Sequence, residues 1–350
     1  MKKSRISLRE LAKMANCHYT TVSRALKGHP GIPQETRERI EKLAQTHHYR
    51  PDPALGALNA YRNSKRKKHF QGTLAWLDFF PGRAQTMEVY PRTWRGCVAH
   101  ADTLGYQVEM FWGGDPAMKG NRLSRILRQR GIQGLLFAPL PNPGLKLEME
   151  WEWFSCVSLS PSLLQPQMHA AYCNQFESMR MMVRELYLMG YRRLALAMEE
   201  AHDERVRFSW TAGFIAGTHH LGIERKDAIL RTAGYRTWDL SVFESWVRKT
   251  RPDVIIAADY DFRPVLAEMG LRVPEDIGCV WTDPRGFGPE AGGLDQQFGL
   301  MAQSAVNFVV AMIQRAETGL PTEPLQVMNS SLWVPGSTVR QQEVNSSHRI

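Results

Sequence analysis

The stretch from Ile6 to Leu26 constrains this chain more than any other, because it holds two short helical patterns joined by a tight polar turn. Ser7 and Glu10 have the spacing of a capping box, in which each side chain satisfies an unpaired amide at a helix start. One apolar stripe then follows over two turns, made of Leu8, Leu11, Ala12 and Ala15. Asn16 stands where the chain must turn, and asparagine tolerates a left-handed backbone. The pattern predicts a short, one-sided helix that ends in a tight turn.

Two further helices are predicted behind that turn. The first runs from about Tyr19 to Leu26 and buries Val22 and Leu26. Its outward side carries only hydrogen-bonding side chains, namely Tyr19, Thr20, Ser23 and Arg24. The second runs from about Gln34 to His47, and its buried residues are Ile40, Leu43, Ala44 and His47. A helix with such an outer face suits the major groove of DNA, and the alternative is a small bundle of three ordinary helices.

The charge of the chain is concentrated in its first fifth. Residues 1–70 hold 16 Lys and Arg against 5 Asp and Glu, a surplus of 11 positive charges. The whole chain carries +9, so the remaining residues have a net charge of −2. A cationic head on a near-neutral body is typical of a polyanion-binding domain attached to a separate sensor or scaffold.

Length and composition limit the class of protein. At 350 residues, two or three folding units are expected. No run approaches the roughly 18 apolar residues of a membrane span, and the first residues lack the apolar stretch of a signal peptide, so we expect no membrane partner. The five cysteines lie far apart without a CxxC pair, which favours a reducing cytoplasm and suggests neither a disulfide framework nor a zinc site, so we expect no metal. The glycine-rich segment 286–293 has the wrong spacing for a dinucleotide fingerprint, and we expect no cofactor.

The residues after Tyr49 have the pattern of a conditional helix. Asp52 can cap a helix that begins at Pro53, since the fixed angle and missing donor of proline suit that position. Gly56 destabilises such a helix by roughly 1 kcal/mol relative to alanine, and so short a helix does not persist alone. We therefore expect it to form only against another surface. The basic run from Lys65 to Lys68 fits a solvated linker.

From Gly72 onward the pattern changes to alternating strands and helices. Amphipathic stretches separate seven apolar runs, at 73–79, 107–112, 134–138, 155–159, 193–198, 254–258 and 278–281. Such alternation predicts parallel sheets with right-handed crossovers. Ligands of open α/β sheets bind beyond the carboxyl ends of the strands, so polar residues at those ends are the candidates for a small-molecule site.

The segment SLRELAKMANCHYTTVSRALKGHPGIPQETRERIEKLAQTHHYRPDP resembles the head of the LacI/GalR (lactose-repressor) transcription factors. GIQGLLFAP, LYLMGYRRLALA, AGFIAG, RPDVIIAADYD and LRVPEDIGCVWTD resemble the sensor of the same family, so that the resemblance covers nearly the whole chain. It implies an all-α helix-turn-helix DNA-binding head and an α/β two-lobed sensor similar to the periplasmic sugar-binding proteins. The turn Asn16-Cys17-His18 and Pro33 depart from the family pattern.

The resemblance also implies which residues contact DNA. By position, Tyr19, Thr20 and Arg24 are base-reading, and Ser7, Thr21 and Ser23 lie nearer the phosphates. The linker becomes a hinge helix in the family, in which Leu58 is the minor-groove wedge and Leu55 faces the partner helix. Asp52 places a carboxylate near the phosphates, where the family more often has asparagine. The alternative for the two leucines is that they cap the core of the head.

The predicted boundaries follow from these patterns. The expected units are a DNA-binding domain at 1–50, a hinge helix and linker at 51–70, an effector-binding domain at 71–340 and a polar tail at 341–350. Within the effector-binding domain we expect an N-subdomain at about 71–161 and 298–326, and a C-subdomain at about 162–297 and 327–340.

Candidate effector-binding residues lie at the predicted strand ends. They are Asp78, Phe79, Asp259, Asp261 and Asp283, since carboxylates accept from sugar hydroxyls and aromatic faces cover a ring. Asp283 falls where the family has its hydroxyl-binding aspartate, and the alternative for each other carboxylate is that it caps a helix or faces solvent. The family's ligand-gripping arginine corresponds to either Arg205 or Arg207, although both lie farther than usual from Gly213, and Trp210 occupies the position where that arginine is expected.

The resulting hypothesis is a transcriptional repressor that binds a palindromic operator as a homodimer and responds to a small-molecule effector. We expect a sugar, while sugar phosphates and nucleobases stay open as classes. The alternative is a cytoplasmic sugar-binding protein or a sugar-converting enzyme on the same α/β body. No GxSxG, GxxxxGK or HExxH motif occurs, so the sequence predicts no enzyme.

Overall fold

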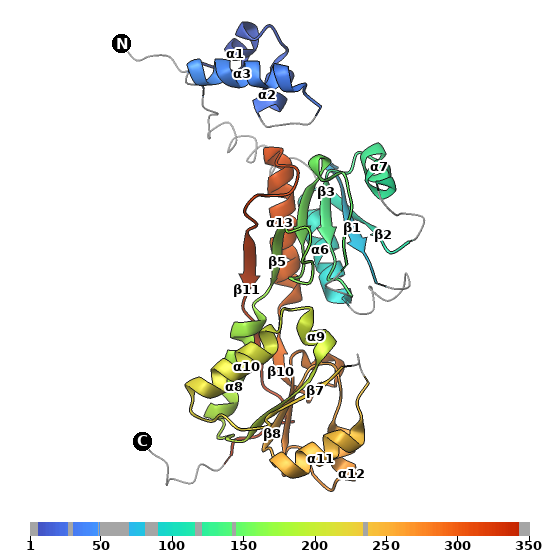
Figure 1. The fold of residues 1–350 in the computed structure, drawn as a ribbon, viewed down its shortest axis with the longest axis vertical. Coiled ribbons are helices and arrows are strands. Elements are labelled where there is room, and N and C mark those ends of the chain that lie inside the picture. The colour runs from blue at the N-terminus through green and yellow to red at the C-terminus, as the bar shows by residue number, and fades with distance from the viewer. Residues whose placement is uncertain are drawn as a thin grey trace, which may run out of the picture.

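The structure is a computed structural model, and it describes residues 6–26, 31–47, 49, 70–80, 90–115, 121–141, 145–233 and 237–342. These residues form a small helical head and a body of two α/β lobes (Figure 1). None of the described helices is long and apolar enough to cross a bilayer.

The head consists of three helices, α1 (Leu8–Met14), α2 (Tyr19–Leu26) and α3 (Gln34–Thr46). The predicted capping box is confirmed, because Ser7 Oγ accepts from the Glu10 amide at 3.3 Å and the Glu10 carboxylate accepts from the Ser7 amide at 2.7 Å. Asn16 adopts the predicted left-handed conformation with φ +48°. The core of the head is built from side chains of all three helices: Leu11, Ala12, Ala15, Val22, Ala25, Ile40 and Ala44.

Three details of the predicted head are wrong. His47 follows the end of α3 and is exposed rather than buried. Leu26 is only half-buried, because Ala25 turns inward beside Val22 at the end of α2, and Leu43 of α3 is half-buried as well. The predicted hinge residues Asp52, Leu55 and Leu58 lie outside the described residues.

The first lobe is a sheet of six parallel strands in the order β11-β5-β4-β3-β1-β2, with Leu74 of β1 opposite Gly134 of β3. Helices α6 (Pro91–Thr103) and α13 (Phe298–Arg315) pack on one face, and α7 (Arg122–Gln129) and the 3-10 turn η2 (Trp151–Trp153) cover the other. The strands are β1 (Gly72–Asp78), β2 (Tyr106–Trp112), β3 (Gly134–Phe137), β4 (Ser155–Ser158), β5 (His169–Cys173) and β11 (Gln326–Asn329).

The second lobe repeats this arrangement in the order β12-β10-β9-β8-β6-β7, with only β12 antiparallel to its neighbour. Its strands are β6 (Leu194–Glu199), β7 (Ile229–Thr232), β8 (Val254–Ala257), β9 (Gly278–Trp281), β10 (Gly292–Asp295) and β12 (Leu332–Val334). Its helices are α8 (Gln175–Leu188), α9 (Glu200–Glu204), α10 (Ser209–His220), α11 (Leu240–Thr250), α12 (Arg263–Glu268) and the 3-10 turn η3 (Pro284–Gly286). Two apolar clusters, one with α8 and α10 and one with α11 and α12, fill the two faces of the sheet.

The chain crosses between the lobes three times, after β5, after β10 and after β11. The three crossings are hydrogen-bonded to one another: the Asn174 amide donates to the Asn329 carbonyl at 3.0 Å, and Asn329 Nδ2 donates to the Gln296 carbonyl at 2.9 Å. The expected boundary between 161 and 162 is wrong, because β5 pairs in parallel with β4 and keeps the chain in the first lobe as far as Cys173. The last crossing likewise follows 329 rather than 326, since β11 pairs with β5.

Candidate functional site

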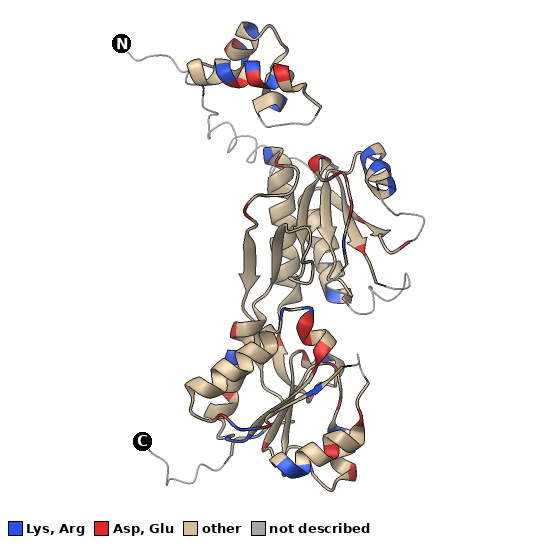
Figure 2. Cartoon of the chain, in the orientation of Figure 1, with Lys and Arg blue, Asp and Glu red and all other residues tan. Residues whose placement is uncertain are grey.

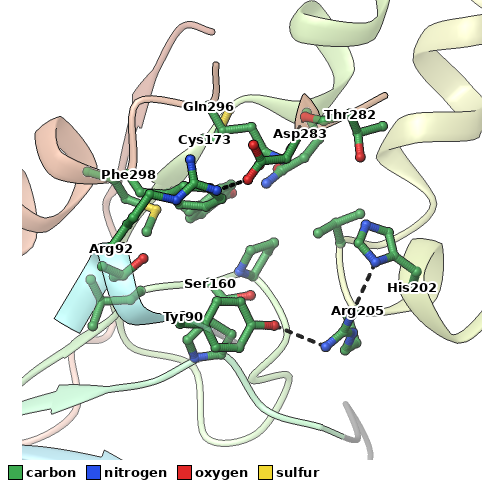
Figure 3. Close-up of a pocket in the computed structure, with 18 of the residues that line it drawn as sticks. Tyr90, Arg92, Ser160, Cys173, His202, Arg205, Thr282, Asp283, Gln296 and Phe298 are labelled. Carbon is green, nitrogen blue, oxygen red and sulfur yellow. Dashed lines mark hydrogen bonds and ion pairs between the residues drawn. The ribbon is translucent and has the colours of Figure 1, made fainter. Parts of the chain in front are cut away.

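A cavity of about 250 Å³ lies between the two lobes, at the carboxyl ends of the strands (Figure 3). Both lobes line it, as the alternation of strands and helices predicted. The lining residues of the first lobe are Tyr90, Pro91, Arg92, Thr93, Pro139, Leu159, Ser160, Pro161, Tyr172, Cys173, Phe298 and Met301. Those of the second lobe and the crossings are Gln175, His202, Arg205, Val206, Trp210, Asp259, Thr282, Asp283 and Gln296.

An ion pair between Arg92 and Asp283 closes one side of the cavity, where Figure 3 shows the two side chains meeting. Arg92 comes from the start of α6 in the first lobe, and Asp283 follows β9 in the second. The guanidinium also lies 4.8 Å from the centre of the Phe298 ring. Burial lowers the pKa of Arg92 to about 10, helped by the nearby Arg285 and Arg95 and opposed by Asp295. The carboxylate that we predicted to bind effector hydroxyls is therefore held by an arginine of the opposite lobe.

A second bridge across the cavity joins Arg205 to Tyr90. Arg205 Nη1 donates to the Tyr90 hydroxyl at 3.0 Å, and Arg205 Nη2 lies 3.2 Å from His202 Nδ1. Burial raises the pKa of the Tyr90 hydroxyl, an effect that the Arg205 charge opposes. Tyr90 stands immediately before α6, whereas Arg205 follows α9, so this contact also links the two lobes.

His202 lies beside two carboxylates. Its Nδ1 is 3.1 Å from Asp259 Oδ2, and one potential ligand atom from each of Glu199, His202 and Asp259 lies within 4.8 Å of the others. This spacing could hold a metal ion. However, the same His202 nitrogen is 3.2 Å from the Arg205 guanidinium, whose charge opposes a cation there. The carboxylates of Glu199 and Asp259, together with His202, are better suited to accept hydrogen bonds from ligand hydroxyls.

Trp210 forms part of the cavity wall and is 1% exposed. Its position is fixed by Asp203, a fully buried carboxylate that accepts from the amides of Trp210 at 3.1 Å and Thr211 at 3.5 Å. Asp203 thus anchors the first turn of α10 although Phe208, at the cap position, contributes no side-chain bond. Trp210, a predicted effector residue, therefore lines the cavity, and the sequence reasoning did not identify Asp203.

Four predicted effector residues do not line the cavity: Asp78, Phe79, Arg207 and Asp261. Asp78 ends β1 and is buried, and it accepts from the Phe80 amide at 2.9 Å, so it caps the turn instead. Phe79 stacks on Phe137 with centroids 6.3 Å apart, on the side of the sheet that α7 covers. Arg207 points to the Pro161 carbonyl at 3.3 Å, which leaves Arg205 as the arginine that lines the cavity.

Asp261, the remaining carboxylate, is held by Arg263 at 2.7 Å and does not line the cavity. Several lining residues were missed by sequence reasoning: Arg92, Thr93, Tyr172, Cys173, Gln175, His202, Thr282, Gln296 and Phe298. Most stand at the first turn of a helix or just after a strand. Residue type does not mark them, because their position opposite Asp283 and Arg205 follows only from how the two lobes face each other.

The head presents a second candidate site on α2. Tyr19, Thr20 and Arg24 are exposed, and Thr21 and Ser23 are half-buried. The His18 ring packs 4.4 Å from Tyr19, and His18 Nδ1 lies 2.8 Å from Thr20 Oγ1. Figure 2 shows Lys and Arg on all three helices of the head. An outward row of hydrogen-bonding side chains on a basic three-helix unit has the form of a major-groove reader.

Ser7 has a local structural role. It is exposed, but its hydroxyl also donates to the Glu10 carboxylate at 2.8 Å within the capping box. A contact from Ser7 to a phosphate would have to share the hydroxyl with this cap.

Comparisons with known proteins found relatives of the head and of the whole chain. The sequence profile of "Bacterial regulatory proteins, lacI family" matches residues 7–52. A fructose operon regulatory protein of Vibrio cholerae is 25% identical over 92% of this chain and 99% of its own length. The probable HTH-type transcriptional repressor ExuR of Bacillus subtilis is 36% identical over 67 residues, 19% of each chain.

Solved structures show the same fold. A complex of the transcriptional regulator CelR with cellobiose superposes with a TM-score of 0.59, 18% identity, and coverage of 95% of this chain and 100% of its own. A lac repressor dimer bound to operator and the anti-inducer ONPF gives a TM-score of 0.56, 18% identity, and coverage of 96% and 99%. At this identity the likeness establishes the arrangement of a helical head and two α/β lobes.

Proposed function

The chain belongs to the lacI family of bacterial regulatory proteins, and on that premise we propose a repressor that binds a palindromic operator as a dimer and is controlled by a sugar in the inter-lobe cavity. The observation that carries the proposal is a cavity bridged from both lobes, behind a head whose α2 exposes a polar face. A ligand in such a cavity competes with or adds to the bridging contacts, so it biases the angle between the lobes.

For DNA, we propose that Tyr19, Thr20 and Arg24 read base edges in the major groove. Their exposure on one side of α2 supports this assignment, and within the described part of the chain Arg24 forms no ion pair. Thr21 and Ser23, with Ser7, are proposed to lie nearer the phosphates. Asp52, Leu55 and Leu58 keep their proposed hinge roles from the family resemblance alone.

For the effector, we propose that Asp259, Asp283, Arg205 and Trp210 form the sugar site. Asp259 and Asp283 supply acceptors for hydroxyls, Arg205 supplies donors, and the Trp210 ring supplies an apolar face. The CelR structure contains cellobiose and the Vibrio relative is named for a fructose operon, which supports a carbohydrate ligand here.

We propose that this chain binds its ligand without converting it. His202 is the histidine that lines the cavity, and its recorded partners are Asp259 and Arg205. Among the described residues, no hydroxyl or thiol is hydrogen-bonded to it as a nucleophile would be. A dimer is proposed because one head of this size reads only a half-site, and two-fold symmetric operators match paired heads.

A selection of operator sequences from a genomic DNA pool tests the DNA-binding part. The parent should enrich a two-fold symmetric site, with affinity that falls steeply as salt rises. Arg24→Ala should lose specificity by about 1–3 kcal/mol at one base pair in each half-site. Lys42→Ala removes an equally exposed charge from α3 and should weaken binding without changing the preferred sequence. An unchanged preference in Arg24→Ala would refute the base-reading role.

A further inference from the structure

The first turn of α6 faces the cavity with unsatisfied donors. This helix has 13 residues, its preceding residue Tyr90 contributes no side-chain cap, and Pro91 has no amide hydrogen. The Trp94 amide is the first that bonds back within the turn, to the Tyr90 carbonyl at 3.1 Å. Within the described residues, the amides of Arg92 and Thr93 have no recorded acceptor, and both residues line the cavity.

The Thr93 side chain adds an independent observation. Thr93 is 1% exposed, and its hydroxyl has no hydrogen-bond partner among the described residues. Leaving a buried hydroxyl unpaired costs about 1–3 kcal/mol, so such a group in a cavity wall indicates a missing partner. Arg92 Nη1 is likewise buried without an acceptor, although Nη2 is bonded to Asp283.

The opposite lobe contributes a third unpaired side-chain donor. Trp210 Nε1 is buried in the cavity wall without an acceptor in the described structure, and an indole nitrogen can only donate. The unpaired groups are therefore two amides, a guanidinium nitrogen, an indole nitrogen and a hydroxyl. All of them can donate, and only the hydroxyl can also accept.

The chemistry of the missing partner follows from this surplus of donors. Each hydroxyl of a neutral sugar brings one donor with its acceptor, whereas a carboxylate or phosphate brings acceptors only. The N-terminus of a helix carries a partial positive charge that favours an anion. Arg95 and Arg285 lie close enough to Arg92 to lower its pKa, although Arg285 is ion-paired to Asp295. Asp283 balances the charge of Arg92 itself.

We propose that the effector carries an anionic group, a carboxylate or a phosphate, that binds at the first turn of α6 to the Thr93 hydroxyl, the amides of Arg92 and Thr93, and the Arg92 guanidinium. The hydroxyls of the same molecule then face Asp259 and His202 across the cavity. This inference rests on the proposed function, because it names the class of effector for the same site. Sugar acids and sugar phosphates share the required chemistry.

Calorimetric titration of the full chain, without DNA, tests the inference. The probes are glucose, galactose and fructose, their 6-phosphates, and glucuronate and galacturonate, all at one ionic strength. At least one anionic sugar should bind 10-fold or more tightly than its neutral parent, and the arm that does so separates carboxylate from phosphate. Thr93→Val should raise the dissociation constant of that anionic sugar about 10-fold or more, which corresponds to the loss of one charge-assisted hydrogen bond.

The test variant Thr93→Val replaces an unpaired hydroxyl with a methyl group of similar size, so the fold should be retained. Two controls accompany it, a second variant and the neutral sugars. Thr103→Val alters an exposed threonine at the other end of α6 and should change nothing. Neutral sugars should bind both variants as they bind the parent.

Three results would overturn the inference: neutral sugars that bind as tightly as their anionic forms, equal weakening of both classes by Thr93→Val, or no binding by any of the probes. If only a neutral sugar releases the operator, the proposed regulatory function is supported and the proposed anion site is refuted. If no specific operator is found, the proposed regulatory function is refuted, and the titration still tests the anion site independently.

Discussion

The bridge between Arg92 and Asp283 gives a quantitative prediction about the ligand-free protein. Exposed ion pairs couple by about 0.2–1 kcal/mol, and breaking a fully buried pair costs about 3–5 kcal/mol. The Arg92 and Asp283 side chains are 31% and 21% exposed, so the pair lies between these limits. We expect a coupling energy of about 1–2 kcal/mol at low salt, smaller at 1 M NaCl because of screening.

A double-mutant cycle of Arg92→Gln and Asp283→Asn isolates this coupling. In the parent, the Arg285 amide donates to Asp283 Oδ1 at 3.3 Å. Asparagine keeps an oxygen that can accept this bond, so the turn η3 should be retained. Arg92→Gln also loses the contact with the Phe298 ring, worth about 0.5–1 kcal/mol. That loss occurs with either residue at 283, so it cancels in the cycle.

Urea unfolding followed by tryptophan fluorescence is a suitable assay, because all 10 tryptophans lie between Trp76 and Trp333 and none lies in the head. The signal therefore reports the two lobes. Additive effects of the two substitutions at low salt, with a coupling energy indistinguishable from zero, would mean that the lobes are not bridged here in solution and would refute the reasoning.

Two further predictions concern buried groups. Burial raises the pKa of Asp78, so the free energy of unfolding of the parent should fall as pH rises through that raised value. In urea unfolding from pH 3 to 8, Asp78→Asn should show a smaller fall than the parent. Parallel curves for parent and variant would contradict this prediction. Burial also raises the pKa of the thiols of Cys97, Cys156, Cys173 and Cys279, whereas Cys17 in the head is only half-buried. One thiol should react with a chromogenic disulfide under native conditions and five in denaturant, and Cys17→Ser should abolish the native reaction; a remaining fast thiol would be inconsistent with this structure.

Much of the fold could be predicted from the sequence, because its signals are local. All seven predicted strands are confirmed, with ends within one residue, since each is a short apolar run bounded by turns. The capping box at Ser7 and the left-handed Asn16 are likewise set by neighbouring residues.

Among the described residues, five strands were not predicted, and two of them, β5 and β10, lack such local signals. β5 reads HAAYC, and β10 reads GGLD, so small or polar residues interrupt the apolar pattern. They are strands because a distant segment pairs with them, as β11 does with β5. The boundary placed at 161 failed for the same reason, since only the pairing of β5 with β4 keeps that segment in the first lobe.

The candidate cavity was predictable in kind but not in detail. Asp259 and Asp283 were predicted from their position after a strand, and both line the cavity. Asp78 and Phe79 meet the same criterion, but their side chains make other contacts. Arg92 and Thr93 could not be identified, because their importance depends on how the start of α6 faces the other lobe. That arrangement is a property of the three crossings, not of any motif.

The coupling between cavity and operator is the central claim, and fluorescence anisotropy of operator DNA tests it most directly. A small molecule that binds the parent, and binds Asp259→Asn more weakly, is titrated into the operator complex. We predict that it changes the operator dissociation constant by about 5- to 150-fold, and that operator DNA changes the dissociation constant of the molecule by the same factor. A molecule that saturates the cavity and leaves operator affinity unchanged would contradict the account.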